Sequence, residues 1–238
     1  MGLLLHGFFW FPIIALPLPM DVPVSKWFRP RRLPTWRIWL PTLLIFGGLV
    51  CWLGPKIYGW LAVTDRVADA RYVVVEGWAP DFVLTAAERE FDDANAVLLL
   101  TTGLPLEQGT LLSEYKDYAT LAATTLAKLG MEPGKIYPVP APAAQRDRTA
   151  AMAAALKTAL DGLQIPAADK KLQLVTFGTH ARRSWVIYQR VLGPEWQVGV
   201  VSVPQRNFPE DTWYQHSSGA KGVIDELVAL LVVAVGGE

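Results

Sequence analysis

Cysteine and histidine are scarce in this chain, and this scarcity excludes several kinds of site. The single cysteine, Cys51, allows no intrachain disulfide and no cysteine-ligated metal, while an oxidising compartment remains permitted. His6, His180 and His216 are the only histidines, and His6 lies in an apolar N-terminal stretch. We therefore expect no multi-histidine zinc site, and the scarcity of these residues leads us to assign no set of metal ligands.

Common nucleotide-binding and nucleophile motifs are absent as well. The chain has no Gly-x-Gly-x-x-Gly, no Walker-type loop and no serine-centred elbow. A dinucleotide- or ATP-dependent enzyme is therefore disfavoured, and the sequence identifies no cofactor. The carboxylates are too scattered to predict a glycosidase pair.

Neither sign of charge is in excess. The chain has 22 Lys+Arg and 22 Asp+Glu, so the overall charge predicts no nucleic-acid partner. The local distribution is uneven, because a basic cluster immediately precedes an apolar run from Ile38 to Val63, and this cluster consists of Lys26, Arg29, Arg31, Arg32 and Arg37. Within the run, the segment from Trp39 to Gly54 carries no charge.

The apolar run is long enough, with its flanks, to cross a bilayer. Aromatic residues stand near both of its ends, as in interfacial aromatic belts: Trp36, Trp39, Trp52, Tyr58 and Trp60. The alternative is a buried helix of a soluble protein, but such a helix rarely follows so basic a segment. We predict a transmembrane helix at 38–63, with the lipid bilayer as a partner.

The basic cluster also predicts orientation. Positively charged flanks stay in the cytoplasm, so residues 64–238 should lie outside it, anchored by a single pass through the inner (plasma) membrane. Residues 1–20 are apolar, lack a basic n-region and a cleavage site, and make a poor signal peptide. They are a second membrane segment, an interfacial stretch, or an extension from a mis-assigned start. The predicted organisation is thus 1–37, an apolar and basic segment; 38–63, the membrane helix; and 64–238, a folded domain.

The domain from residue 64 alternates strands with helices. Strands are predicted at Tyr72–Glu76, Ala96–Thr101, Lys135–Val139, Leu172–Thr176 and Gln197–Val203. Helices are predicted at Pro80–Asp93, Ser113–Leu129, Asp147–Gly162, Thr179–Leu192 and Ala220–Val235, with Ser113, Thr179 and either Ser217 or Ser218 as N-caps. This alternation predicts a Rossmann-like, three-layer α/β domain with a five-stranded, mostly parallel sheet.

Parallel sheets collect their ligands at the carboxyl ends of the strands, and this rule gathers distant residues into one predicted site. The residues that follow the first four strands are Glu76, Gly77 and Trp78; Thr102 and Gly103; Asp147, Arg148 and Thr149; and Thr176, Gly178 and His180. The aromatic stretch Phe208–Ser218 follows the fifth strand. It is either a lid over the crevice or a segment in which Trp213 and Tyr214 are fixed onto the domain.

The start of the helix at Thr179 carries unusual charge. His180, Arg182 and Arg183 occupy its first turn, where free backbone N–H groups and the helix dipole already favour an anion. We therefore predict a phosphate or carboxylate ligand held by Thr179, Arg182 and Arg183; the alternative is that both arginines face solvent. His180 and Glu76 are the candidate catalytic residues, predicted to act as proton-transfer partners across the crevice. The alternatives for Glu76 are that it orients His180, binds a metal or simply pairs with Arg182.

These residues resemble the DUF218 or YdcF-like family, which includes SanA- and ElyC-like envelope proteins. The similarity covers most of the chain after Arg71. It depends mainly on Asp147-Arg148-Thr149 before an alanine-rich helix and on Val175-Thr176 followed by His180-Ala181-Arg182-Arg183, supported by Glu76-Gly77-Trp78, Thr102-Gly103 and Ser113-Glu114. The chain departs from the family at Glu76, where many members have glycine. It departs again at Arg148 and at Ala150–Ala155, where many have asparagine and a later Glu-Asn pair.

The resemblance implies a Rossmann-like domain tethered by one membrane helix and acting in undecaprenyl-lipid or peptidoglycan metabolism of the cell envelope. It also adds Glu114 to the predicted ligand-binding residues, although a carboxylate near a helix start suits the dipole in any case. We expect a small phosphate-bearing ligand that is bound, hydrolysed or transferred. The alternatives are a non-catalytic regulator that acts through protein partners, and an S-adenosylmethionine-binding protein.

Overall fold

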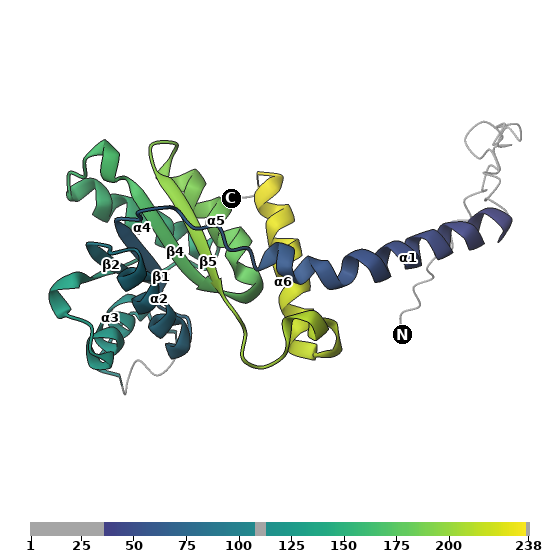
Figure 1. Ribbon diagram of the computed structural model, residues 1–238, viewed down its shortest axis with the longest axis horizontal. Helices are drawn as coiled ribbons and strands as arrows, with labels where there is room; N and C mark the ends of the chain where they lie inside the picture. The colour runs from purple at the N-terminus through teal and green to yellow at the C-terminus, as the bar shows by residue number, and fades with distance from the viewer. Residues whose placement is uncertain (1–35, 108–112, 237–238) are drawn as a thin grey trace, which may run out of the picture. The chain divides into compact units, whose positions relative to one another are not determined.

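A computed structural model describes residues 36–107 and 113–236 (Figure 1). The apolar stretch and most of the basic cluster predicted before residue 36 lie outside the described residues. The chain forms two compact units, Met1–Ile45 and Phe46–Glu238. A single helix, α1 (Trp36–Leu61), runs through the boundary between them.

The second unit contains a five-stranded sheet whose strands are all parallel, in the order β3-β2-β1-β4-β5. The strands are β1 (Tyr72–Glu76), β2 (Leu98–Gly103), β3 (Ile136–Pro140), β4 (Lys171–Phe177) and β5 (Gln197–Val203). The helices are α2 (Asp81–Asp93), α3 (Tyr118–Leu129), α4 (Arg148–Gly162), α5 (Ala181–Leu192) and α6 (Ser217–Ala234). Short 3-10 turns are η2 (Pro133–Lys135), η3 (Ala167–Asp169), η4 (Gly178–His180) and η5 (Glu210–Gln215). The predicted three-layer, Rossmann-like fold is confirmed.

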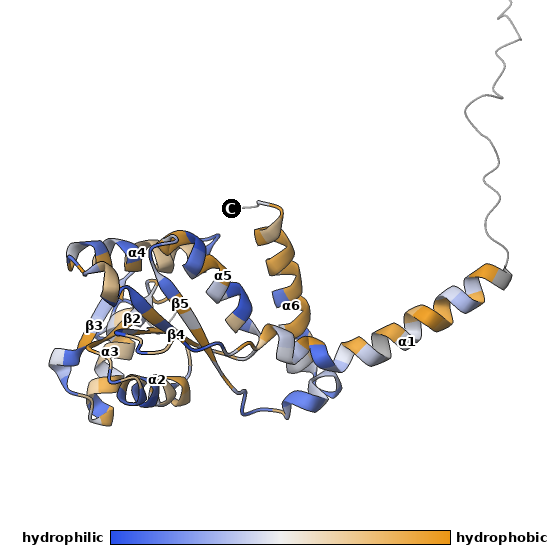
Figure 2. Ribbon diagram, turned by 45° about the horizontal axis from the view of Figure 1, so that its top comes forward, coloured by the Kyte–Doolittle hydropathy of each residue, from blue (hydrophilic) through white to orange (hydrophobic). Residues whose placement is uncertain are grey.

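The sheet is covered by helices on both faces (Figure 2). Because strand side chains alternate between faces, Val74, Leu100 and Leu174 pack under α4 and α5, while their neighbours Val73 and Val75 pack under α2 and α3. The three central strands, β1, β2 and β4, are almost wholly buried, which explains why their sequences are continuous apolar runs instead of alternating ones.

Two of the strand-end glycines belong to this packing. A Cβ on Gly77 would lie 2.4 Å from the carbonyl oxygen of Tyr118, and one on Gly103 would lie 2.4 Å from the backbone nitrogen of Ala119. No side chain fits there, so both glycines let the start of α3 approach the ends of β1 and β2. Gly77 and Gly103 are among the predicted ligand-binding residues, and in the structure their lack of a side chain serves helix packing.

The predicted N-caps were wrong in three helices. α3 begins five residues later than predicted, because Asp117 rather than Ser113 accepts a hydrogen bond from the Thr120 backbone N–H. α5 begins at Ala181, after η4, so Thr179 does not cap it and is instead buried. α6 begins at Ser217, so neither Ser217 nor Ser218 is its cap.

The segment Ile38–Leu61 of α1 is long and apolar enough to cross a membrane, as predicted for 38–63. Its last turns contribute to a third apolar cluster, in which Tyr58 and Leu61 pack with Phe208 and Trp213 near η5 and with Val223 of α6. The stretch after β5 is therefore fixed onto the domain through Trp213, while Tyr214 is 52% exposed.

Candidate functional site

The polar ends of three strands point to the same face of the sheet. Glu76 is the last residue of β1, and Thr102 and Thr176 are the next-to-last residues of β2 and β4. Each continues the alternation that places Val74, Leu100 and Leu174 under α4 and α5. β1 and β4 are neighbours although α2, β2, α3, β3 and α4 separate them in the chain. This is the point where the strand order reverses, which is where open parallel sheets bind ligands.

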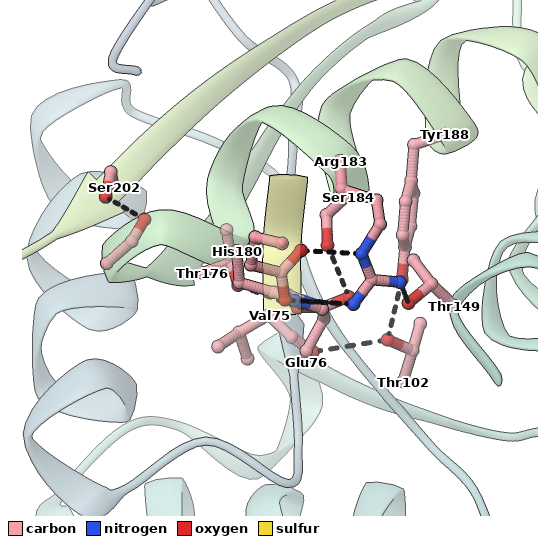
Figure 3. Close-up of polar contacts among 12 residues, drawn as sticks. Val75, Glu76, Thr102, Thr149, Thr176, His180, Arg183, Ser184, Tyr188 and Ser202 are labelled. Carbon is pink, nitrogen blue, oxygen red and sulfur yellow. Dashed lines mark hydrogen bonds and ion pairs between the residues drawn. The ribbon is translucent and has the colours of Figure 1, made fainter. Parts of the chain in front are cut away.

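Glu76 is a fully buried carboxylate at this switch point. Its Oε2 accepts a hydrogen bond from Thr176 Oγ1 at 2.7 Å, and its Oε1 accepts one from Ser184 Oγ at 3.1 Å (Figure 3). The hydroxyl of Thr102, next in the sheet, lies 3.1 Å from the buried hydroxyl of Tyr188. Every polar side chain at these strand ends therefore has a partner on α5 or on the neighbouring strand.

His180 lies between two carboxylates. Its Nε2 is 3.5 Å from Glu76 Oε2, an ion pair longer than a direct hydrogen bond, and its Nδ1 is 2.8 Å from Oε1 of Glu226 on α6. The edge of the Trp78 ring closes one side, with 5.1 Å between the ring centres. Because the imidazole faces a carboxylate at each nitrogen, this arrangement favours its protonated form.

Arg183 forms a bidentate ion pair with the same Glu226 carboxylate. Its Nε donates to Oε2 at 2.6 Å and its Nη2 donates to Oε1 at 3.1 Å, while Nη1 donates to Thr149 Oγ1 at 3.3 Å. Nη2 also lies 2.9 Å from Nδ1 of His180. A guanidinium cannot accept a hydrogen bond, so with His180 protonated both cations donate to Glu226 Oε1.

Electrostatics around His180 follow from this geometry. Burial alone would lower the pKa of His180, but the charge of Glu76 and the hydrogen bond to Glu226 outweigh it and raise the pKa to about 9. Burial would raise the pKa of Glu226, yet the hydrogen bonds from His180 and Arg183 lower it to about 2. The pKa of Glu76 is also lowered, because the His180 charge and its hydrogen bonds overcome the effect of burial.

A cavity of about 740 Å³ opens beside this network. Its polar wall includes His180, Arg183, Thr149, Arg148 and Glu226, and Arg148 forms an ion pair with Glu107 at 3.1 Å. Its apolar wall combines residues from the domain with residues of α6: Leu104, Met152, Ile187, Ala229, Val232 and Val233. The cavity thus has a charged end and an apolar side.

Several predicted site residues meet here, and others do not. Five of them line the cavity, namely His180, Arg183, Arg148, Thr149 and Trp78. Three more, Glu76, Thr176 and Thr102, lie at the strand ends and belong to the hydrogen-bond network beside the cavity. The remaining predicted residues do not line the cavity, namely Gly77, Gly103, Glu114, Gly178, Thr179 and Arg182.

Arg182 is the clearest correction among these. Its Nε donates to the carbonyl oxygen of Trp60 at 2.5 Å, and its guanidinium lies 4.3 Å from the centre of the Trp60 ring. It therefore contacts the end of α1 and takes no part in the cavity. Glu114 is exposed in the loop before α3, and Gly178 is the turn residue of η4, with φ +56° and its carbonyl accepting from Ser202 Oγ.

Three residues of the network were not predicted. Ser184 and Tyr188 follow His180 at intervals of four, so they lie on one face of α5, and this spacing could have been recognised in the sequence. Glu226 directly follows Asp225 where the apolar half of α6 begins, and nothing in the local sequence distinguishes this partly buried carboxylate from its exposed neighbour. Among the described residues, no cluster of three or more His, Cys, Asp or Glu side chains could hold a metal ion.

No protein-family model, curated protein or solved structure matches this chain. The resemblance to DUF218 or YdcF-like proteins therefore stays a prediction, and the geometry of the site carries the functional argument.

Proposed function

We propose that the protein binds a phosphate-bearing ligand in this cavity, with Arg183 and His180 as its principal anion-binding groups. One observation carries the proposal: two cations converge on the carboxylate of Glu226 at the wall of the cavity. The bidentate contact of Arg183 is the arrangement with which guanidinium groups bind either carboxylate or phosphate oxygens. In the structure, Glu226 supplies that oxyanion from within the chain.

A ligand anion that binds His180 and Arg183 must displace the Glu226 carboxylate from them. His180 and Arg183 contribute two positive charges, and Glu76 and Glu226 contribute two negative ones, so the network is neutral as it stands. A phosphate that joined it without displacing Glu226 would meet a carboxylate at close range. Removing Glu226 leaves one uncompensated positive charge, which favours an incoming anion.

The apolar side of the cavity supports a ligand with a hydrophobic part. The same cavity that the charged groups line is also lined by apolar residues of two helices, namely Ile187 of α5 and Ala229, Val232 and Val233 of α6. A phosphate linked to an isoprenoid or acyl chain would match both ends, and the resemblance to DUF218 proteins points to the same class. We propose an envelope precursor such as an undecaprenyl-linked intermediate.

For a ligand that is hydrolysed or transferred, His180 is the residue placed to donate a proton to a leaving oxygen. Glu76 is fully buried and does not line the cavity, so it acts as a positioning residue that keeps His180 protonated. This proposed role for Glu76 differs from the prediction that His180 and Glu76 are proton-transfer partners.

The test is binding of undecaprenyl phosphate and of inorganic phosphate to the full chain in lipid nanodiscs. Arg183→Ala removes a charge-assisted contact worth about 1.5–3 kcal/mol, so its affinity should fall roughly 10- to 100-fold. Glu226→Gln keeps the shape of the side chain but removes the competing charge, so its affinity should rise. Arg182→Ala is the matched control, because Arg182 contacts Trp60 and should leave binding unchanged.

Equal affinities of the wild type and the Arg183→Ala variant for both ligands would reject the assignment. Binding of undecaprenyl phosphate but not of inorganic phosphate would show that the apolar wall contributes. Equal binding of the two would assign recognition to the phosphate alone.

We also propose that α1 anchors the protein in the inner (plasma) membrane by a single pass, with residues 64–238 outside the cytoplasm. Support comes from the length and apolar composition of Ile38–Leu61 and from the basic residues that precede it.

A further inference from the structure

α6 carries an apolar face that no described residue covers. Ile224, Val228, Leu231 and Val235 are 58%, 56%, 66% and 83% exposed. At 3.6 residues per turn these positions lie along one side of the helix, and we call them the α6 stripe. The segment Leu227–Val235 contains no charged residue, which is unusual for a surface helix exposed to water.

A second side of α6 packs on the end of α1. Val223 is buried against Tyr58 and Leu61, and Leu227 and Leu230 adjoin the same cluster. These residues of α1 belong to the same compact unit as α6. α6 therefore begins where the membrane-spanning candidate Ile38–Leu61 ends.

The end of α1 has the character of a membrane–water interface. Trp52 and Trp60 are 63% and 51% exposed, and each has a cation over its ring: Lys56 at 4.0 Å and Arg182 at 4.3 Å. Exposed tryptophans beside basic side chains are typical of the headgroup region. Figures 1 and 2 show α6 crossing the C-terminal end of α1 instead of continuing in its direction.

We infer that α6 lies in the surface of the lipid bilayer with the α6 stripe in contact with lipid. Leu227–Val235 would extend only about 14 Å as a helix, against about 30 Å for the hydrocarbon core, so it lies in the interface and does not span. This inference rests on the proposed anchoring by α1 and goes beyond the proposed ligand. Burial of an apolar face at the headgroup boundary is the way that interfacial helices bind membranes.

The third side of α6 faces the cavity. Glu226, Ala229 and Val233 line it, and on the helix these positions lie roughly opposite to the α6 stripe. A helix that contacts lipid on one side thus forms a wall of the cavity on the other. A ligand with an apolar chain could enter the cavity directly from the bilayer along this wall.

Nitroxide labels on the full chain in lipid nanodiscs test the inference. In a Cys51→Ser background, single cysteines replace Ile224, Val228 or Leu231, and collision rates with oxygen and with a water-soluble nickel chelate are measured. Leu163→Cys is the matched control, because Leu163 is apolar, 42% exposed and directly follows α4 instead of belonging to α1 or α6. Leu49→Cys reports the anchor itself.

The expected result is a several-fold higher ratio of oxygen to nickel collisions at the α6 stripe and at Leu49 than at Leu163. Water-like values at the stripe with lipid-like values at Leu49 would overturn the inference and leave the anchor intact. Water-like values at the α6 stripe and at Leu49 would overturn both this inference and the proposed anchoring by α1. Exclusion of both reagents with dipolar broadening would also overturn it, since the stripe would then be covered by a second copy of the chain.

Discussion

At the scale of single residues, one imidazole connects the sheet to α6. His180 contacts Glu76 on one side and Glu226 on the other, and Arg183 completes the charge balance. A buried ion network of this kind contributes little net stability while it is complete, but losing one member leaves an uncompensated charge. The stability of the domain should therefore depend on pH through His180 and Glu226.

The pH dependence has a definite sign. The pKa of His180 is raised to about 9 in the folded protein, against about 6.5 in the unfolded chain. Its contribution to the unfolding free energy is therefore complete below about pH 6.5 and is lost as the pH rises from there through about 9. Glu226, with its pKa lowered to about 2, contributes above about 4.5 and loses its contribution as the pH falls towards 2. We expect the wild type to lose on the order of 2 kcal/mol of unfolding free energy between pH 6 and pH 9.5.

Denaturant titrations of the full chain in detergent micelles would measure this loss. His180→Gln should have a flat profile over the alkaline range, whereas Lys157→Gln, which removes an exposed charge elsewhere, should follow the wild type. Parallel curves for the wild type and the His180→Gln variant would contradict the proposed network.

At the scale of elements, the start of α3 packs directly against the ends of β1 and β2 because two glycines there have no side chain. Gly77 and Gly103 bring those strand ends into direct contact with Tyr118 and Ala119 at the first turn of α3. The backbone itself is the obstacle to any substitution, so no side-chain rotation can relieve it.

Gly77→Ala and Gly103→Ala should each destabilise the domain by about 1–3 kcal/mol, the usual cost of overpacking a rigid interior. Gly162→Ala is the control, because its Cβ would meet nothing within 4 Å at the end of α4. That variant should be neutral or more stable by up to about 1 kcal/mol, because alanine favours the helix. Thermal unfolding followed by circular dichroism distinguishes the two classes, and equal melting temperatures for all three would refute the packing role.

At the scale of the whole molecule, α6 contacts the end of α1 on one side and lines the cavity on another, and the proposed anchoring by α1 would hold this domain close to a bilayer surface. The apolar side of the cavity lies on the same helix that meets the end of α1. The proposed ligand site, the proposed membrane contact and the Glu226 carboxylate all involve α6, so a movement of that helix would affect all three.

The proposed topology predicts where a reporter at the end of the chain will be active. Alkaline phosphatase fused after Glu238 should be active and green fluorescent protein fused there should be dark, because only the first folds productively outside the cytoplasm. Fusions after Arg37, before the apolar run, should give the reverse pattern. Bright fluorescence after Glu238 would place the domain in the cytoplasm.

The sequence by itself determined the layers of the fold and the apolar helix. Alternating strands and helices and a long uncharged run are local patterns, and burial of a parallel sheet on both faces leaves a direct trace in the composition of its strands. The rule that ligands gather at strand ends then brought Glu76, Thr176 and His180 together correctly, since sheet order and strand direction follow from the same alternation.

Tertiary structure alone decided which charges meet. Arg182 and Arg183 are adjacent, but consecutive positions on a helix point about 100° apart, so the packing of α5 sends one to Trp60 and the other to the cavity. Glu226 lies 46 residues from His180 in the chain, and only the placement of α6 brings its carboxylate to the imidazole. Local patterns cannot predict a pairing of this kind, because it depends on how whole elements pack and not on the spacing of residues within them.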